Sequence, residues 1–196
     1  MASLAPAASS PKQVDSQPLI PSELKSEAML IKDFIPNPDI LLTKAIETYP
    51  WQDDIKSRRT ASFGAPYKSS HIEYPERAFP PELNELIDLI ERAVGWRPNN
   101  CLLNLYNSGE NSMGFHSDDK GAMADGTGVV IISLGAERSL TFRKVGDHEE
   151  TFSVPLPSGS LFSMSREMQD TWQHALKKDK ECADPRISMT FRSLPG

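Results

Sequence analysis

The feature that most restricts the fold is the sequence beyond Gly95, which breaks into short, largely apolar segments of strand length. Turns rich in Gly, Pro, Asp and Ser separate these segments. Seven strands are expected there: Cys101–Tyr106, Val129–Leu134, Ser139–Arg143, Thr151–Leu156, Ser160–Met164, Thr171–Leu176 and Arg186–Arg192. Many short strands in succession predict a β-sandwich or a jelly roll.

Two helices are expected before these strands. The first begins at Pro38, with Asn37 as its N-cap, and continues to about Tyr49. The second begins at Pro80 and ends at Gly95, a residue that favours the left-handed backbone of a helix end. Its apolar residues recur at helical spacing and form one stripe: Leu83, Leu86, Ile87, Ile90 and Val94. We therefore expect this helix to pack one face against the strands.

The chain is expected to contain one folded domain after an N-terminal tail. Residues 1–27 contain Ala, Ser and four prolines but few large apolar groups, so we expect a flexible segment. The domain then covers residues 28–196 and begins with a strand in the apolar run 28–34. Residues 58–67 fit a strand followed by a turn. The predicted fold class is α+β, mainly β, with a jelly-roll core backed by N-terminal helices.

Composition excludes several classes of protein. With 38% hydrophobic residues and a net charge of −6, the chain is neither disordered throughout nor a uniformly basic nucleic-acid coat protein, although a local basic groove remains compatible. No apolar run reaches the length of a membrane span, and the N-terminus does not fit a signal peptide. Two cysteines are too few for a disulfide framework. We expect an intracellular monomer in the cytoplasm, or in the nucleus of a eukaryote.

Three residues form a candidate metal site. His116 and Asp118 are two residues apart, so on an extended segment their side chains point the same way. His174, on a later predicted strand, completes a set of two histidines and one carboxylate. Such a set leaves adjacent coordination positions open, as in non-haem Fe(II) oxygenases, whereas a structural zinc site is closed. Because His-x-Asp alone is a weak signal, the alternative is a hydrogen-bonded pair at the surface.

The strand expected at residues 186–192 carries a candidate anion site. Period-2 alternation puts Arg186, Ser188, Thr190 and Arg192 on one face and Ile187, Met189 and Phe191 on the other. Two buried arginines require an anionic partner, and a planar guanidinium suits a carboxylate. The alternative is that this face is solvated. Asn104 and Tyr106 likewise share one face of an earlier strand.

Together these elements resemble the AlkB family of Fe(II)/2-oxoglutarate dioxygenases. The resemblance covers residues 58–192 and is strongest over residues 100–120, 131–144 and 157–192. The stretches that carry it are LLNLYNSGENSMGFHSDD (102–119), ISLGAER (132–138) and RISMTFR (186–192). It implies a double-stranded β-helix fold, Fe(II) bound by His116, Asp118 and His174, and 2-oxoglutarate and O2 as co-substrates. The co-substrate contacts that it implies are Arg186 and Tyr106 at the distal carboxylate, together with Asn104, Ser188 and Arg192.

The resemblance implies oxidative demethylation of N-alkylated nucleobases in DNA or RNA, with methylated single-stranded nucleic acid as the substrate. The implied substrate-binding residues are Arg58, Arg59, Tyr67 and Lys120. Lys120 departs from the family pattern, because nucleic-acid demethylases often have an acidic residue there and an ammonium cannot accept a hydrogen bond. Asp119 is the available substitute, and Ser69 stands where a second aromatic residue is common.

Two alternatives follow from these departures. One is an AlkB-like dioxygenase that acts on a protein or a small molecule, and the other is a binding module that keeps the fold without turnover. Clusters of cations on the rim of one cleft would favour a nucleic acid. The candidate cations are Lys56, Arg58, Arg59, Arg143, Lys144, Lys177, Lys178 and Lys180. His71 lies in the segment that resembles the nucleotide-recognition lid, where the alternatives are a contribution to recognition and simple exposure on a loop. His148 is expected in a solvated hairpin turn and is given no role.

Overall fold

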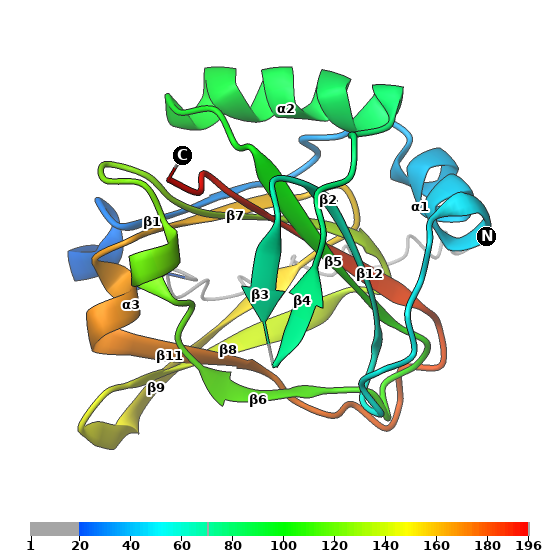
Figure 1. Ribbon diagram of the computed structural model, residues 1–196. Coiled ribbons are helices and arrows are strands. Elements are labelled where there is room, and N and C mark those ends of the chain that lie inside the picture. Colours follow the sequence, from blue (N-terminus) through cyan, green and yellow to red (C-terminus); the bar gives the residue numbers. More distant parts are fainter. Residues whose placement is uncertain (1–19, 70, 196) are drawn as a thin grey trace, which may run out of the picture.

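The computed structural model describes residues 20–69 and 71–195, and these form two antiparallel sheets that face each other (Figure 1). The strands are β1 (Ala28–Ile31), β2 (Arg59–Gly64), β3 (Tyr67–Ser69), β4 (Ile72–Tyr74), β5 (Asn100–Tyr106), β6 (Met113–His116), β7 (Gly128–Gly135), β8 (Arg138–Lys144), β9 (Asp147–Leu156), β10 (Leu161–Ser165), β11 (Trp172–Leu176) and β12 (Arg186–Arg192). The larger sheet has the order β1-β10-β7-β12-β5-β2, and the smaller has the order β6-β11-β8-β9. A separate hairpin pairs β3 with β4. The jelly-roll prediction is confirmed.

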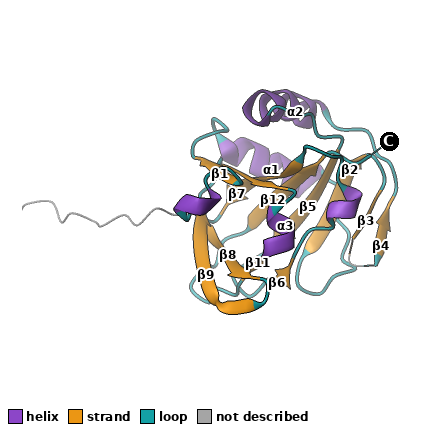
Figure 2. Cartoon of the chain, turned by 90° about the vertical axis from the view of Figure 1, so that its left-hand side faces the viewer, coloured by secondary structure: helices purple, strands orange, loops and turns teal. Residues whose placement is uncertain are grey.

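Two helices, α1 (Pro38–Thr48) and α2 (Pro81–Val94), lie on the outer side of the larger sheet (Figure 2). Helix α2 ends as predicted, because Gly95 adopts a φ of 82° and its N–H donates to the Glu91 carbonyl oxygen. The capping prediction for α1 is wrong in its mechanism: Asn37 is at the N-cap position, but its side chain makes no capping hydrogen bond. No helix in the described ranges is long and apolar enough to cross a membrane.

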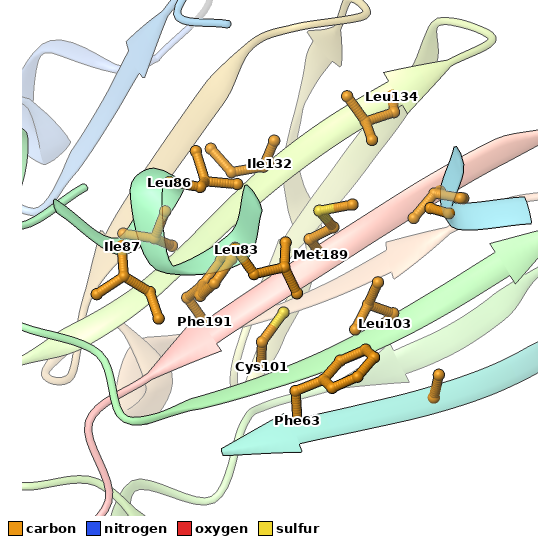
Figure 3. Packing of buried hydrophobic residues seen from close by; sticks show 14 of the residues in the cluster. Phe63, Leu83, Leu86, Ile87, Cys101, Leu103, Ile132, Leu134, Met189 and Phe191 are labelled. Carbon is orange, nitrogen blue, oxygen red and sulfur yellow. The ribbon is translucent and has the colours of Figure 1, made fainter. Parts of the chain in front are cut away.

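An apolar core fills the space between these helices and the larger sheet (Figure 3). The predicted stripe of α2 points into it, and Leu83, Leu86 and Ile87 are buried there. From the sheet side, Met189 and Phe191 of β12 pack into the same core and are fully buried. This packing fixes which face of each strand points away from the helices, toward the smaller sheet.

The space between the two sheets is apolar at one end and polar at the other. Val129 and Ile131 of β7 pack there with Phe142 of β8 and Phe162 of β10. Beside them, β12 and β5 turn polar side chains into the same space: Arg186, Ser188, Thr190, Arg192, Asn104 and Tyr106. These polar groups line a cavity instead of a core.

The expected boundary of the N-terminal tail needs correction. Of the expected flexible segment 1–27, residues 1–19 lie outside the described residues. Residues 20–27 are described and include a short 3-10 helix, Ser22–Leu24. Leu24 is buried in the core between the sheets, and the Glu27 carbonyl oxygen accepts a hydrogen bond from the Ser165 N–H. Folded structure therefore begins before residue 28, because Leu24 gains burial there.

Several short elements, among them β6, were not predicted. Strand β4 turns the expected turn after residue 64 into a hairpin with β3. The helix α3 (Met168–Thr171) precedes β11, so the strand expected from Thr171 begins at Trp172. A second short helix of 3-10 type, Lys120–Ala122, follows the predicted metal-binding residues. Strand β3 of the hairpin lines the polar cavity, whereas no residue of α3 or of Lys120–Ala122 does.

Candidate active site

The three predicted metal ligands meet at the polar end of the sandwich. His116 ends β6, and its registered partner across the antiparallel pairing with β11 is His174. Asp118 follows His116 by two residues, and the ligand atoms of all three side chains lie within 4.8 Å of one another. The centroids of the two imidazole rings are 4.3 Å apart. The alternative of an isolated surface pair is therefore wrong.

The protonation states suit a cation. Burial raises the pKa of Asp118, but the Arg192 guanidinium and the two histidines lower it more, to about 2. Burial lowers the pKa of His174 to about 4, against the opposing effect of Asp118. With its proton on Nδ1, His116 donates to the Gly114 carbonyl oxygen at 2.9 Å and keeps the lone pair of Nε2 free. At neutral pH the site thus offers a carboxylate and a neutral His174 imidazole, the forms that bind metals.

One buried carboxylate oxygen indicates where a cation fits. Asp118 Oδ1 accepts a hydrogen bond of 2.5 Å from Arg192 Nη2. Its other oxygen, Oδ2, is buried, has no hydrogen-bond partner and lies 3.7 Å from His174 Nε2. An unpartnered buried carboxylate oxygen is costly unless a cation compensates it. The donor set of two nitrogens and one oxygen fits Fe(II) with open positions.

The arginine face of β12 is buried, so the alternative of a solvated face is wrong. Arg186 and Arg192 are only 2% and 4% exposed. Arg186 Nη2 donates to Ser133 Oγ at 2.9 Å, whereas its buried Nε has no partner. Burial lowers the pKa of Arg186 to about 10, so it is still protonated at neutral pH. The Tyr106 ring lies beside it, with its centroid 5.7 Å from Arg186 Cζ. A buried cation without a carboxylate partner in the described chain fits an anionic ligand.

A cavity of about 510 Å³ joins the candidate metal ligands to the arginine face of β12. Its polar lining from the two sheets comprises His116, Asp118, His174, Asn104, Tyr106, Arg186, Ser188, Thr190 and Arg192. The β3 strand of the hairpin adds Tyr67, and Arg192 Cζ lies 5.0 Å from the centroid of the Tyr67 ring. Arg58 is half-buried in the wall, where its Nε donates to Asn104 Oδ1 at 2.7 Å. The volume is within the range of small-molecule sites.

Two of the predicted substrate-binding residues lie outside this cavity. Lys120 Nζ pairs with Asp170 Oδ2 of α3 at 2.5 Å and does not line the cavity, whereas Asp119 does. Arg59 pairs with Asp53 at 2.7 Å and is also absent from the lining. Both side chains are held by carboxylates that the sequence pattern did not connect to them. His148, expected to have no role, is exposed on β9.

Three functional residues were missed. Ser133 is the hydrogen-bond partner of Arg186, and Gln169 accepts a hydrogen bond from the Asp118 N–H. Both contacts join residues more than 50 positions apart, so no local pattern indicates them. Phe115 lines the cavity mouth, with Arg143 Cζ 4.2 Å from its ring centroid. An aromatic residue directly before His116 on an extended segment was the one available signal.

Comparison with known proteins agrees with this geometry. The family model described as "2OG-Fe(II) oxygenase superfamily" matches residues 43–192. The chain belongs to this superfamily. The 2OG-Fe(II) oxygenases are named for the two groups that the cavity fits, a ferrous ion at the histidine–aspartate set and an anionic co-substrate at Arg186.

Relatives within the 2OG-Fe(II) oxygenases confirm the expected AlkB family. "Alpha-ketoglutarate-dependent dioxygenase alkB homolog 3" of Homo sapiens is 31% identical over 175 residues, which cover 80% of this chain and 61% of that protein. "DNA oxidative demethylase ALKBH2" of Homo sapiens is 29% identical over 147 residues, covering 70% and 56%. The chain thus spans about three fifths of the length of these relatives. A solved structure titled "The structure of OsALKBH1" matches with a TM-score of 0.66 at 18% identity, covering 85% of this chain and 98% of that one, which supports the fold.

Proposed function

We propose that the protein is an Fe(II)- and 2-oxoglutarate-dependent dioxygenase that demethylates N-methylated bases in single-stranded DNA or RNA. The observation that carries this proposal is the buried cavity that joins the metal donor set to Arg186. The printed names of the relatives, an alpha-ketoglutarate-dependent dioxygenase and a DNA oxidative demethylase, support it. A monomer that acts inside the cell is part of the same proposal.

The co-substrate would bind along β12 and β5. The Arg186 guanidinium is the counter-charge for the distal carboxylate of 2-oxoglutarate, and its fork geometry suits two parallel hydrogen bonds. Tyr106 would donate its hydroxyl hydrogen to the same carboxylate, because burial raises the pKa of this phenol and keeps it protonated. Bound Fe(II) would supply the chemistry by which O2 oxidises 2-oxoglutarate to succinate and CO2 and an N-methyl group to an N-hydroxymethyl group. The N–C bond of that group would then break, which leaves N–H on the base and releases formaldehyde.

The hairpin and the loop after the metal ligands would hold the base. Tyr67 offers an aromatic surface on which a base can stack. Asp119 is an exposed carboxylate at the cavity wall, where an oxygen can accept a hydrogen bond from an exocyclic amine. Its Oδ1 also accepts from the Gly121 N–H, which orients the side chain. Since the Lys120 ammonium is paired with Asp170 outside the cavity, it leaves this acceptor unobstructed.

Three cations that fit phosphates lie at or beside the cavity: Arg58 lines it, and Arg143 and Lys177 contact Phe115, which lines it. Arg58 and Arg143 are half-buried, and no carboxylate within the described residues pairs with either. Arg143 also stacks on Phe115, and Lys177 Nζ lies 5.6 Å from the same ring centroid. In contrast, Lys144 pairs with Glu150. Unpaired cations beside an aromatic ring are typical of surfaces that bind single-stranded nucleic acid.

The direct test is a panel of oligonucleotides carrying N-methylated adenine or cytosine, as single- and double-stranded DNA and RNA. With iron, ascorbate and 2-oxoglutarate, we expect demethylated bases by mass spectrometry and one formaldehyde per methyl group removed. Unmethylated oligonucleotides of the same sequence are the control. Succinate formation without demethylation of any oligonucleotide would instead favour a protein or small-molecule substrate. Absence of both succinate and formaldehyde would overturn the dioxygenase itself.

A further inference from the structure

The short helix α3 is hydrogen-bonded to the segment that carries Asp118, and this contact has no part in the proposed reaction. Gln169, in the middle of α3, is only 5% exposed although its side chain is polar. Its Oε1 accepts a hydrogen bond of 2.9 Å from the backbone N–H of Asp118. A buried amide side chain is stable only where such partners exist, so this position links α3 to the metal-ligating carboxylate.

Further polar contacts join the same two segments. Ser117 Oγ donates to the Trp172 carbonyl oxygen at 3.3 Å, and Lys120 Nζ pairs with Asp170 at 2.5 Å. Arg166 Nε donates to the Lys120 carbonyl oxygen at 3.0 Å. Four polar contacts therefore join residues 117–120 to residues 166–172. Because β11 continues directly from α3, the same segment also positions His174.

The contact of Gln169 matters because the two carboxylate oxygens of Asp118 have different partners. Its Oδ1 is bound to Arg192 on β12, whereas its Oδ2 must face His174 to share a metal. A fixed backbone at Asp118 lets the carboxylate satisfy both. Without Gln169 Oε1, the Asp118 N–H loses the acceptor that fixes this backbone position.

We propose that Gln169 is a positioning residue that fixes the backbone of Asp118, so that the three metal ligands are arranged before the metal arrives. The proposal rests on the metal site of the proposed function but not on the nature of the substrate. The exposed Lys120–Asp170 pair is a secondary contact, since exposed ion pairs contribute little. Partners that hold metal ligands in place typically affect metal affinity 10- to 100-fold.

The test measures Co(II) binding to the full chain without co-substrate, by calorimetry and by the visible spectrum of the bound ion. Gln169→Leu should weaken Co(II) binding about 10- to 100-fold and change the spectrum. Gln169→Glu keeps an acceptor oxygen and should restore most of the affinity. Gln173→Leu is the matched control: Gln173 lies on the same segment, but its Oε1 accepts from Arg143, so Co(II) affinity should not change. Unchanged affinity and spectrum in a folded Gln169→Leu protein would overturn the proposal.

A second measurement needs no variant. In the metal-free wild-type protein, the Asp118 amide should exchange with solvent as slowly as amides of the neighbouring strands, by NMR. Exchange at the rate of an exposed loop would overturn the proposal even where Gln169→Leu does not fold. Failure of the wild-type chain to bind Co(II) would instead contradict the metal site. Lack of activity on oligonucleotides would contradict only the proposed substrate.

Discussion

The two faces of strand β12 are equally buried but opposite in chemistry. Ile187, Met189 and Phe191 face the helices and are fully buried among apolar side chains. Arg186 and Arg192 face the smaller sheet and are almost as deeply buried, yet each has nitrogen atoms without a hydrogen-bond partner. Burial stabilises the first face by about 25 cal/mol per Å². On the second face, Asp118 compensates Arg192, whereas the burial of Arg186 is destabilising unless a ligand supplies the anion. Burial alone therefore does not separate a core from a site; the available partners do.

The largest effect is expected at the metal set, where activity should be lost without loss of the fold. His116→Ala removes one of three ligands, so turnover should fall by about four orders of magnitude or more. Formaldehyde release and Co(II) titration measure this, with thermal unfolding as the check on folding. His148→Ala, a histidine exposed on β9, is the matched control and should behave as wild type. A fully active His116→Ala protein would show that the site is elsewhere.

On the helix-facing side of β12, the expected loss is one of stability. Phe191→Ala removes a fully buried ring and should lower the free energy of unfolding by about 3–5 kcal/mol. Thr190→Ala, the neighbouring residue on the cavity face, should cost about 1 kcal/mol or less. Denaturant unfolding of both variants compares the two faces directly. Equal losses would contradict the division of the strand into a core face and a site face.

Arg186 should show the reverse pattern. Arg186→Ala should weaken 2-oxoglutarate binding about 100-fold, equivalent to about 2.7 kcal/mol, and leave Co(II) affinity unchanged. The free energy of unfolding of the ligand-free protein should not fall, because the variant removes a buried charge that no carboxylate compensates. Arg186→Lys keeps the charge but lacks the planar guanidinium, so its affinity for 2-oxoglutarate should lie between those of the wild type and Arg186→Ala. Calorimetry with 2-oxoglutarate decides; equal binding by wild type and Arg186→Ala would refute this role.

At the cavity mouth, smaller effects on substrate affinity are expected. Oligonucleotide affinity should fall with salt along a straight line in a plot of log affinity against log salt concentration. Arg58→Ala and Arg143→Ala should each reduce the slope of that line by about 1, because each removes one phosphate contact. Arg59→Ala is the matched control, since Arg59 is already paired with Asp53. Binding isotherms at several salt concentrations give the slopes. Identical slopes in all four proteins would exclude these two arginines as phosphate contacts.

The smallest expected effect concerns the helices that cover the core face. Glu82 of α2 accepts hydrogen bonds from Lys44 Nζ at 2.8 Å and from the Tyr49 hydroxyl at 2.9 Å. Burial raises the pKa of Glu82, but these two partners lower it more. A depressed carboxyl pKa stabilises the fold above the unfolded pKa, near 4.5, and this stability is lost as the pH falls through the lower folded value.

Wild type should therefore lose more free energy of unfolding between neutral and acid pH than Glu82→Gln does, by less than about 1 kcal/mol. Unfolding of wild type and variant at about pH 6 and pH 3 measures this. Glu85→Gln, one turn away, is the control, because within the described residues no ion pair involves Glu85. If the free energy of unfolding of the wild type and of Glu82→Gln fell equally with pH, the stabilising role of the Glu82 hydrogen bonds would be contradicted.

Much of the fold was predictable because its signals are local. Alternation in residues 186–192 correctly assigned both faces of β12, and the apolar stripe of α2 correctly assigned its buried side. Gly95 marked the helix end, since a left-handed backbone favours glycine. The hairpin β3–β4 and helix α3 were missed because segments of three or four residues are too short to display a period.

The proximity of the three candidate metal ligands was predictable from spacing and residue type, whereas the contacts that support them were not. The orientation of Lys120 depends on Asp170, 50 residues later in the chain, and only the fold brings the two together. The same holds for Gln169 and Asp118. The expected tail boundary was late for a similar reason, because Leu24 gains its burial from residues of distant strands.

The most direct test of the account is a crystal structure with Mn(II) and N-oxalylglycine, an unreactive analogue of 2-oxoglutarate. We expect Mn(II) bound by His116, Asp118 and His174, with the distal carboxylate of the analogue on Arg186. The candidate ligand atoms of these three side chains already lie within 4.8 Å of one another, and they should move little when the metal binds. A metal bound by other residues, or an analogue that makes no contact with Arg186, would contradict it.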